Sequence, residues 1–90
     1  MYYTVYILEN QHDKTWYTGM SSNLKQRIKQ HLAGQSTYTA KKPGWKLIYA
    51  ELYLTKQDAS GREKFLKSGA GKKFIRKQLT HYFSDHAKKS

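Results

Sequence analysis

Four side chains capable of acid–base or phosphate chemistry lie close together near the start of the chain. Tyr6 and Tyr17 belong to two short aromatic, β-branched runs separated by polar residues, a pattern typical of a β-hairpin. Arg27 and His31 are four positions apart in a helical pattern and therefore share one helix face. With the turn centred near residues 11 and 12, the two tyrosines lie opposite each other across the hairpin. We expect two phenols, a guanidinium and an imidazole to converge where the helix begins.

These residue types suit reactions at phosphorus, although each has an ordinary explanation. Arg27 on a helix surface is commonly a solvated charge, but its planar guanidinium could instead fork onto two phosphate oxygens. His31 could orient a tyrosine or share its proton. A phenol titrates near pH ~10, so Tyr6 or Tyr17 needs nearby positive charge to act as a base at neutral pH. Otherwise both tyrosines simply fill a small core.

The elements that position these residues follow from periodicity and breakers. Both faces of the first run are apolar, so we expect that strand to be covered on both sides. Gly19 ends the second strand, either as a turn glycine or as a place for close approach of a phosphate. The predicted fold is a single small α/β domain, a three-stranded, largely antiparallel sheet flanked by helices, over residues 1–83, with a basic, frayed tail over 84–90. We predict strands over 2–9, 15–18 and 45–54, helices over 23–33, 56–67 and 72–82, a turn over 10–14, a polar loop over 34–44 and fraying from Ser84.

Composition narrows the class of partner. The 90 residues include 17 lysines and arginines against 6 acids, a net charge of +11, which favours a polyanion such as nucleic acid over a merely solvated basic surface. The sequence has no cysteine, hence no disulfide and no cysteine metal site. It shows no run of membrane-spanning length and no signal-like segment, so we expect a cytoplasmic protein without a membrane partner.

Five sequence elements in order and spacing resemble the GIY-YIG nuclease superfamily, most of all its small stand-alone bacterial members, over about residues 2–83. Thr4 stands where the first signature carries glycine, and His81 lies near the place of an asparagine found in many members. The elements are Thr4-Val5-Tyr6, Tyr17-Thr18-Gly19, Arg27 with His31, residues 43–49 and residues 62–67.

The resemblance implies a metal-dependent endonuclease that hydrolyses DNA phosphodiesters, with repair or recombination structures among its candidate substrates. Tyr6 or Tyr17 would accept or relay the proton of the attacking water, and Arg27 would neutralise the transition state. Glu63 would hold one Mg²⁺ (or Mn²⁺), an ion that accepts one or two carboxylates and keeps several waters. The residues alone favour an ion-pair role for Glu63, and the resemblance reverses that preference.

DNA is the expected partner, bound mainly through its phosphates, and RNA is possible. One alternative is a non-catalytic nucleic-acid-binding module on the same fold. Another is an RNA-associated basic protein whose tyrosines stack bases. The expected phosphate-contacting residues are Lys25, Lys41, Lys42, Lys46, Lys64, Lys67, Lys72, Lys73, Arg76 and Lys77.

Overall fold

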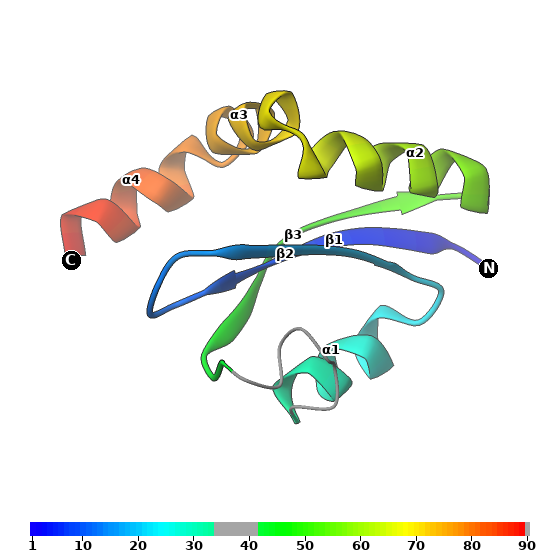
Figure 1. The fold of residues 1–90 in the computed structure, drawn as a ribbon, viewed down its shortest axis with the longest axis horizontal. Coiled ribbons are helices and arrows are strands. Elements are labelled where there is room, and N and C mark those ends of the chain that lie inside the picture. Colours follow the sequence, from blue (N-terminus) through cyan, green and yellow to red (C-terminus); the bar gives the residue numbers. More distant parts are fainter. Residues whose placement is uncertain (34–41, 90) are drawn as a thin grey trace.

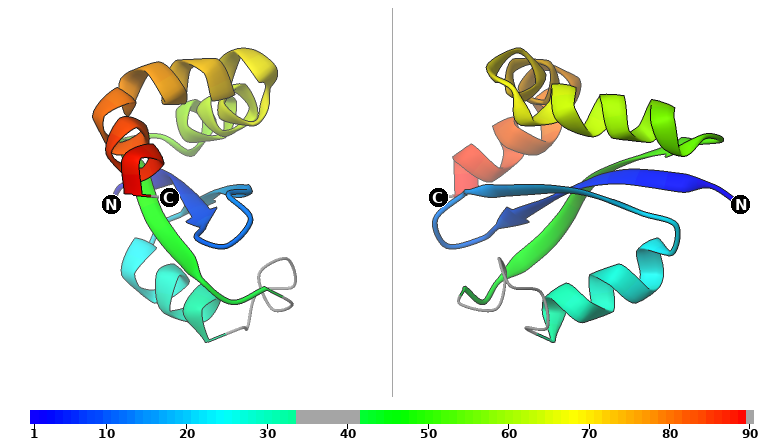
Figure 2. Two further views of the ribbon diagram at one scale, coloured as in Figure 1. Left: turned by 90° about the vertical axis from the view of Figure 1, so that its left-hand side faces the viewer. Right: turned by 45° about the vertical axis from the view of Figure 1, so that its right-hand side comes forward.

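A three-stranded antiparallel sheet forms the middle layer of the molecule. The structure is a computed structural model and describes residues 1–33 and 42–89. The strands are β1 (Tyr3–Asn10), β2 (Trp16–Ser21) and β3 (Trp45–Tyr53), in the order β2-β1-β3. Helix α1 (Leu24–Leu32) covers one face and α2 (Lys56–Lys67) and α3 (Gly69–Gln78) the other, followed by α4 (Thr80–Lys89) (Figures 1 and 2). This confirms the predicted sheet flanked by helices. No helix within the described ranges is long and apolar enough to span a membrane.

The central strand β1 divides the core into two halves. On the α2–α3 face, Val5 and Ile7 are fully buried, and Ala59, Leu66 and Ile75 from those helices join them. Tyr6 and Leu8 point to the α1 face and pack with Trp45; Leu24 and Ile28 of α1 cover them. Successive side chains of a strand alternate between faces, so two apolar sets require two covering layers. The expectation that this strand is covered on both sides is confirmed.

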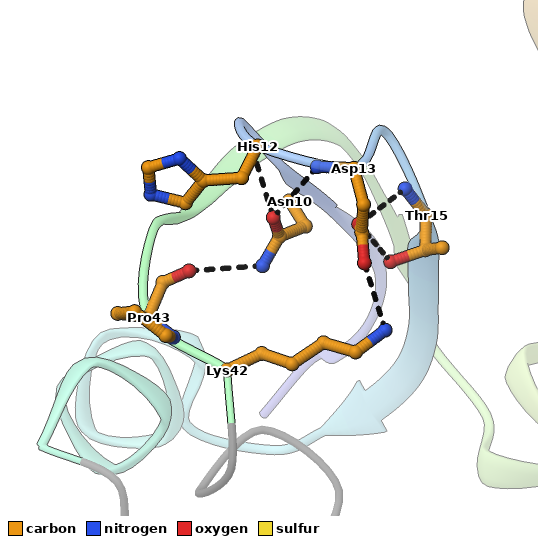
Figure 3. Close-up of polar contacts among 6 residues, drawn as sticks. All are labelled: Asn10, His12, Asp13, Thr15, Lys42 and Pro43. Atoms are coloured by element: carbon orange, nitrogen blue, oxygen red, sulfur yellow. Dashed lines mark hydrogen bonds and ion pairs between the residues drawn. The ribbon is translucent and has the colours of Figure 1, made fainter.

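The hairpin register differs from the predicted one. Tyr6 pairs with Gly19, and Tyr17 pairs with Leu8, so the two tyrosines are diagonal neighbours rather than opposite each other. The Asn10 side chain moves the centre of the turn along the chain, because its Oδ1 accepts the amide hydrogens of the two residues at 12 and 13 (Figure 3). Strand β2 also continues to Ser21, which leaves Gly19 inside the strand rather than at its end.

Side-chain and backbone contacts fasten the hairpin turn to the segment before β3. Asn10 Nδ2 donates to the Pro43 carbonyl at 2.9 Å (Figure 3). The Gln11 amide donates to the Gly44 carbonyl at 2.8 Å. Gly44 has φ +90°, a left-handed conformation that favours glycine. A side chain there would also meet the His12 ring at 2.7 Å. This contact holds the beginning of β3 beside the end of β1.

The chain after α2 forms two helices, α3 and α4, where one helix and a frayed tail were predicted. Gly71 lies inside α3 because that helix packs so closely on α2 that a Cβ at Gly71 would lie 1.9 Å from the Phe65 carbonyl oxygen. Ser68 caps the helix by accepting the Gly71 amide at 3.1 Å. Helix α4 then extends past Ser84, because Tyr82 donates to the buried carboxylate of Glu9 at 2.5 Å.

Candidate active site

A buried phenol–imidazole pair lies between β1 and α1. The Tyr6 hydroxyl and His31 Nε2 are 3.0 Å apart, and the two residues are 0% and 2% exposed. Gly19 makes this arrangement possible, because a Cβ at that position would lie 2.6 Å from the Tyr6 hydroxyl. The missing side chain of Gly19 therefore makes room for the tyrosine rather than providing a turn.

The pair is uncharged at neutral pH. Burial raises the pKa of Tyr6, an effect that hydrogen bonding from Arg27 opposes. Burial, and then the nearby charge of Arg27, lower the pKa of His31 below its ordinary value. A neutral imidazole can accept the tyrosine hydrogen at Nε2. The His31 ring also lies 4.8 Å from the Tyr17 ring, centroid to centroid, so the imidazole packs against both tyrosines.

Arg27 points at the same group from one helical turn earlier. Its pKa is raised, first by hydrogen bonding to the Tyr6 hydroxyl and then by hydrogen bonding to the Tyr17 hydroxyl. Its NH1 atom also donates to Gln30 Oε1 at 3.0 Å. None of the ion pairs in the described ranges involves Arg27. The guanidinium is thus positioned by neutral groups and its charge is not neutralised by a carboxylate.

Glu63 lies on α2, across the sheet from α1. Its carboxylate pairs with Lys67 at 3.4 Å, one helical turn later, and the two side chains are 23% and 57% exposed. After burial and the effects of Arg27 and Tyr17, the charge of Glu63 also contributes to raising the pKa of Tyr6. The structure therefore places Glu63 within electrostatic reach of the cluster formed by Tyr6, Tyr17, Arg27 and His31.

The donor set fits magnesium better than zinc. Within the described residues, no three His, Cys, Asp or Glu side chains gather closely enough to hold a metal ion, as a zinc site requires. Mg²⁺ needs only one or two carboxylates and retains water. Because the Lys67 ammonium is solvent-exposed, its ion pair contributes little to stability, and Lys67 can yield the Glu63 carboxylate at small cost.

The ion pair between Arg62 and Glu51 lies on the same side of the sheet as Glu63, and its geometry suits a role in holding the fold together. Arg62 donates from Nε and from NH2 to the two oxygens of Glu51, at 2.9 and 3.0 Å. Tyr53 donates to the same carboxylate at 2.8 Å, and Tyr49 also donates to it. Burial alone would raise the pKa of Glu51, but these hydrogen bonds hold it below its ordinary value.

The basic residues proposed from the sequence lie on several surfaces. Lys67, Lys72 and Arg76 border two cavities beside β2. Lys73 and Lys77 are exposed on α3 but line neither of these cavities, Lys25 is exposed on α1, and Lys64 is exposed on α2. Lys46 lies over the Tyr82 ring, 5.5 Å from its centroid, and Lys42 pairs with Asp13 at 2.9 Å (Figure 3). Lys41 lies outside the described residues.

Sequence reasoning missed two contributors to the site region. Gln30 holds the Arg27 guanidinium, and Trp16 lines both cavities beside β2. The sequence positions of Gln30 and Trp16 could have indicated both residues. Gln30 lies three residues after Arg27 on a predicted helix, a spacing at which side chains meet. Trp16 directly precedes Tyr17 on a short strand.

Comparison with known proteins identifies the class. The family model described as the GIY-YIG catalytic domain matches residues 2–78, and this chain belongs to that family. A UPF0213 protein from Clostridium perfringens is 41% identical over 64 residues, covering 70% of this chain and 68% of the relative. One from Streptococcus pyogenes serotype M5 is 35% identical over 85 residues, covering 93% and 87%. The solution NMR structure of a UPF0213 protein from Bacillus halodurans matches with a TM-score of 0.56 and 30% identity, covering 88% of this chain and 86% of that one.

Proposed function

We propose that this chain is a divalent-metal-dependent endonuclease that hydrolyses DNA phosphodiester bonds. The observation that carries the proposal is the placement of Arg27. Its guanidinium donates to Gln30, interacts with the Tyr6 and Tyr17 hydroxyls strongly enough to raise its pKa, and is paired with no carboxylate among the described residues. Such a group is suited to stabilise negative charge that develops on a phosphate in the transition state. The net charge of +11 supports a polyanionic substrate.

The two tyrosines have different exposures, which supports different roles. Tyr17 is half-buried and borders a cavity, whereas Tyr6 is 0% exposed. We assign the contact with the attacking water to the Tyr17 hydroxyl, which accepts or relays the water proton. Tyr6 and His31 are positioning residues in this proposal, because their hydrogen-bonded pair packs against Tyr17 and orients Arg27.

Glu63 would hold the metal ion, with Lys67 moving away from the carboxylate. A bound Mg²⁺ or Mn²⁺ would supply Lewis-acid stabilisation of the scissile phosphate and the leaving oxygen. The chain's own contribution there is the Glu63 carboxylate. Its charged neighbours along α2 are basic, namely Arg62, Lys64 and Lys67. That setting favours a phosphate beside the metal.

The test is incubation with nicked, branched, single-stranded and double-stranded DNA, with and without Mg²⁺ or Mn²⁺. We expect cleavage of at least one substrate only when the metal is present, and loss of cleavage in Glu63→Gln. Asp58→Asn is the matched control, since it removes the same charge from an exposed position on the same helix. Binding of every substrate without metal-dependent cleavage would instead indicate a non-catalytic nucleic-acid-binding module on this fold.

A further inference from the structure

Two adjoining cavities lie between the edge strand β2 and the helices α2 and α3. Each has a volume of about 270 Å³, and they share Trp16 and Lys72 in their linings. We call them together the β2–α3 groove. The lining residues that matter here are Lys14, Trp16, Tyr17, Lys67, Lys72 and Arg76.

The groove is basic and shares Tyr17 with the candidate active site. Four of its lining residues are lysine or arginine, and none of the lining residues that the structure describes is acidic. Tyr17, the tyrosine proposed to meet the attacking water, borders one end. Lys67 lies at the same end and pairs with Glu63, the proposed metal ligand. An anionic chain that occupied the groove would therefore lie beside Tyr17 and the Lys67–Glu63 pair.

Trp16 gives the groove a fixed aromatic surface. Its indole stacks on Phe83 of α4 with centroids 5.7 Å apart, and its Nε1 donates to the buried carboxylate of Glu9 at 2.9 Å. The Arg76 guanidinium lies 5.2 Å from the same ring. The cation–π contact holds Arg76 at the groove. Cations that follow a backbone beside aromatic rings are the features by which proteins bind single-stranded nucleic acid.

We propose that the β2–α3 groove binds a single-stranded DNA segment that adjoins the bond to be cut, with its phosphates on Lys67, Lys72 and Arg76. The proposal rests on the proposed function in taking the Glu63 end as the site of cleavage.

Helix α3 supplies its own matched control. Gly71 and Ile75 are buried against the rest of the molecule, and Lys72 and Arg76 follow each of them by one position. Lys73 and Lys77 follow by two positions, are exposed, and line neither cavity. Replacing either pair removes two positive charges from the same helix, so general electrostatic attraction falls equally in both variants.

The experiment measures binding of an oligothymidylate of about ten nucleotides, a length within the usual site size of single-strand binders, in EDTA. Acrylamide quenching of tryptophan fluorescence gives the readout. The chain has two tryptophans, and Trp45 is only 6% exposed, so the quenching reports mainly on Trp16. We expect the oligonucleotide to protect Trp16. We also expect Lys72→Gln/Arg76→Gln to flatten the dependence of log affinity on log salt by about 1.4, at about 0.7 for each lost phosphate contact.

Lys73→Gln/Lys77→Gln should leave that slope and the protection of Trp16 nearly unchanged. Because Arg76→Gln removes a contact with Trp16, Lys72→Gln alone is the second variant, with a slope change of about 0.7 and a melting temperature recorded for each protein. Equal slope changes in the two double variants would overturn the proposal, as would equal protection of Trp16 by a duplex of the same length. Occupancy of the groove without any metal-dependent cleavage would support the groove and contradict the proposed function.

Discussion

Arg62 and Arg27 belong to opposite sides of one sheet and have opposite surroundings. Arg62 forks onto Glu51 and lies over the rings of Phe65 and Phe74, 5.0 and 4.7 Å from their centroids. Arg27 is held by hydroxyl and amide groups that carry no charge. The charge of Arg62 is therefore neutralised within the fold, where it fastens α2 to β3, whereas the charge of Arg27 remains available to an anion.

The two glutamates repeat the contrast. Glu51 accepts hydrogen bonds from three side chains and is largely shielded, with 17% of its side chain exposed. In the described part of the chain, Glu63 forms an ion pair with the exposed ammonium of Lys67 and with no other cation. The type of residue is the same in each pair, so the difference lies in the partners. A charge with a complete set of partners supports the fold, and a charge without one is available for the proposed chemistry.

The largest expected effect separates the two glutamates. Glu63→Gln should reduce metal-dependent cleavage by about 10³-fold, equivalent to about 4 kcal/mol of transition-state stabilisation, with little change in stability. Glu51→Gln should lower the free energy of unfolding by about 2–4 kcal/mol, because it leaves Arg62 without its carboxylate, while the folded fraction still cleaves. Single-turnover cleavage and urea denaturation of both variants decide the matter. Stability loss with retained cleavage in Glu63→Gln would make its pair with Lys67 structural.

Replacing each arginine with lysine should also separate the two roles, with a loss of cleavage rate at Arg27 and a loss of stability at Arg62. Lysine keeps the charge but cannot make a planar two-pronged contact. We expect Arg27→Lys to slow single-turnover cleavage by about 10²- to 10³-fold with little change in DNA affinity. Arg62→Lys should cost about 1–2 kcal/mol of stability and leave the rate nearly unchanged. A rate for Arg27→Lys within a few-fold of the wild type would show that this arginine only attracts DNA.

Replacing each of three glycines with alanine adds one methyl group and compares a position that supports the fold with one that supports the candidate site. Alanine at Gly71 would clash with the Phe65 carbonyl and should lower stability by about 1–3 kcal/mol. Alanine at Gly19 would displace the Tyr6 hydroxyl, so we expect a loss of cleavage that exceeds the loss of stability. Gly61 on α2 has no atom within 4 Å of an added Cβ, and alanine there should stabilise the helix by about 0.5–1 kcal/mol. Thermal melting and cleavage rates check all three.

The smallest expected effect is that His31 and Glu51 change the stability of the protein in two different pH ranges. The lowered pKa of His31 means that the unfolded chain binds a proton before the folded one, so stability should begin to fall below the ordinary value of 6.5 and level off below the folded pKa. Glu51 should act likewise in a lower window, beginning below 4.5. Denaturation at successive pH values should show His31→Gln without the upper decline and Glu51→Gln without the lower one. An unchanged upper decline in His31→Gln would contradict the assignment.

Local patterns were sufficient to predict the sheet and most helices. The alternation of Val5, Tyr6 and Ile7 predicts a strand with two covered faces, and the structure confirms it. Long-range contacts account for what was missed. The docking of α4 depends on a hydrogen bond between Tyr82 and Glu9, 73 residues apart, which no local window reveals. The hairpin register depends on which backbone amides the Asn10 side chain accepts.

The candidate site was predictable as a set of residues but not as an arrangement. Helical spacing placed Arg27 and His31 on one face, and the structure brings both to the tyrosines. The exposures of Tyr6 and Tyr17, which separate their proposed roles, depend on the register and on the room left by Gly19. The partner of Glu63 follows from spacing four residues along a helix, whereas its distance from the hairpin depends on how α2 packs.

The order of strands has a consequence for biosynthesis. The first strand in chain order, β1, is the middle strand of the sheet, so the domain grows outward from its centre as the chain leaves the ribosome. The hairpin and α1, which carry Tyr6, Tyr17, Arg27 and His31, are synthesised before β3, whose Trp45 completes the core around Tyr6. Glu63 follows only after β3 has closed the other edge of β1. The residues of the proposed phosphate-binding half therefore leave the ribosome first, and the proposed cleavage has to wait for Glu63 on α2.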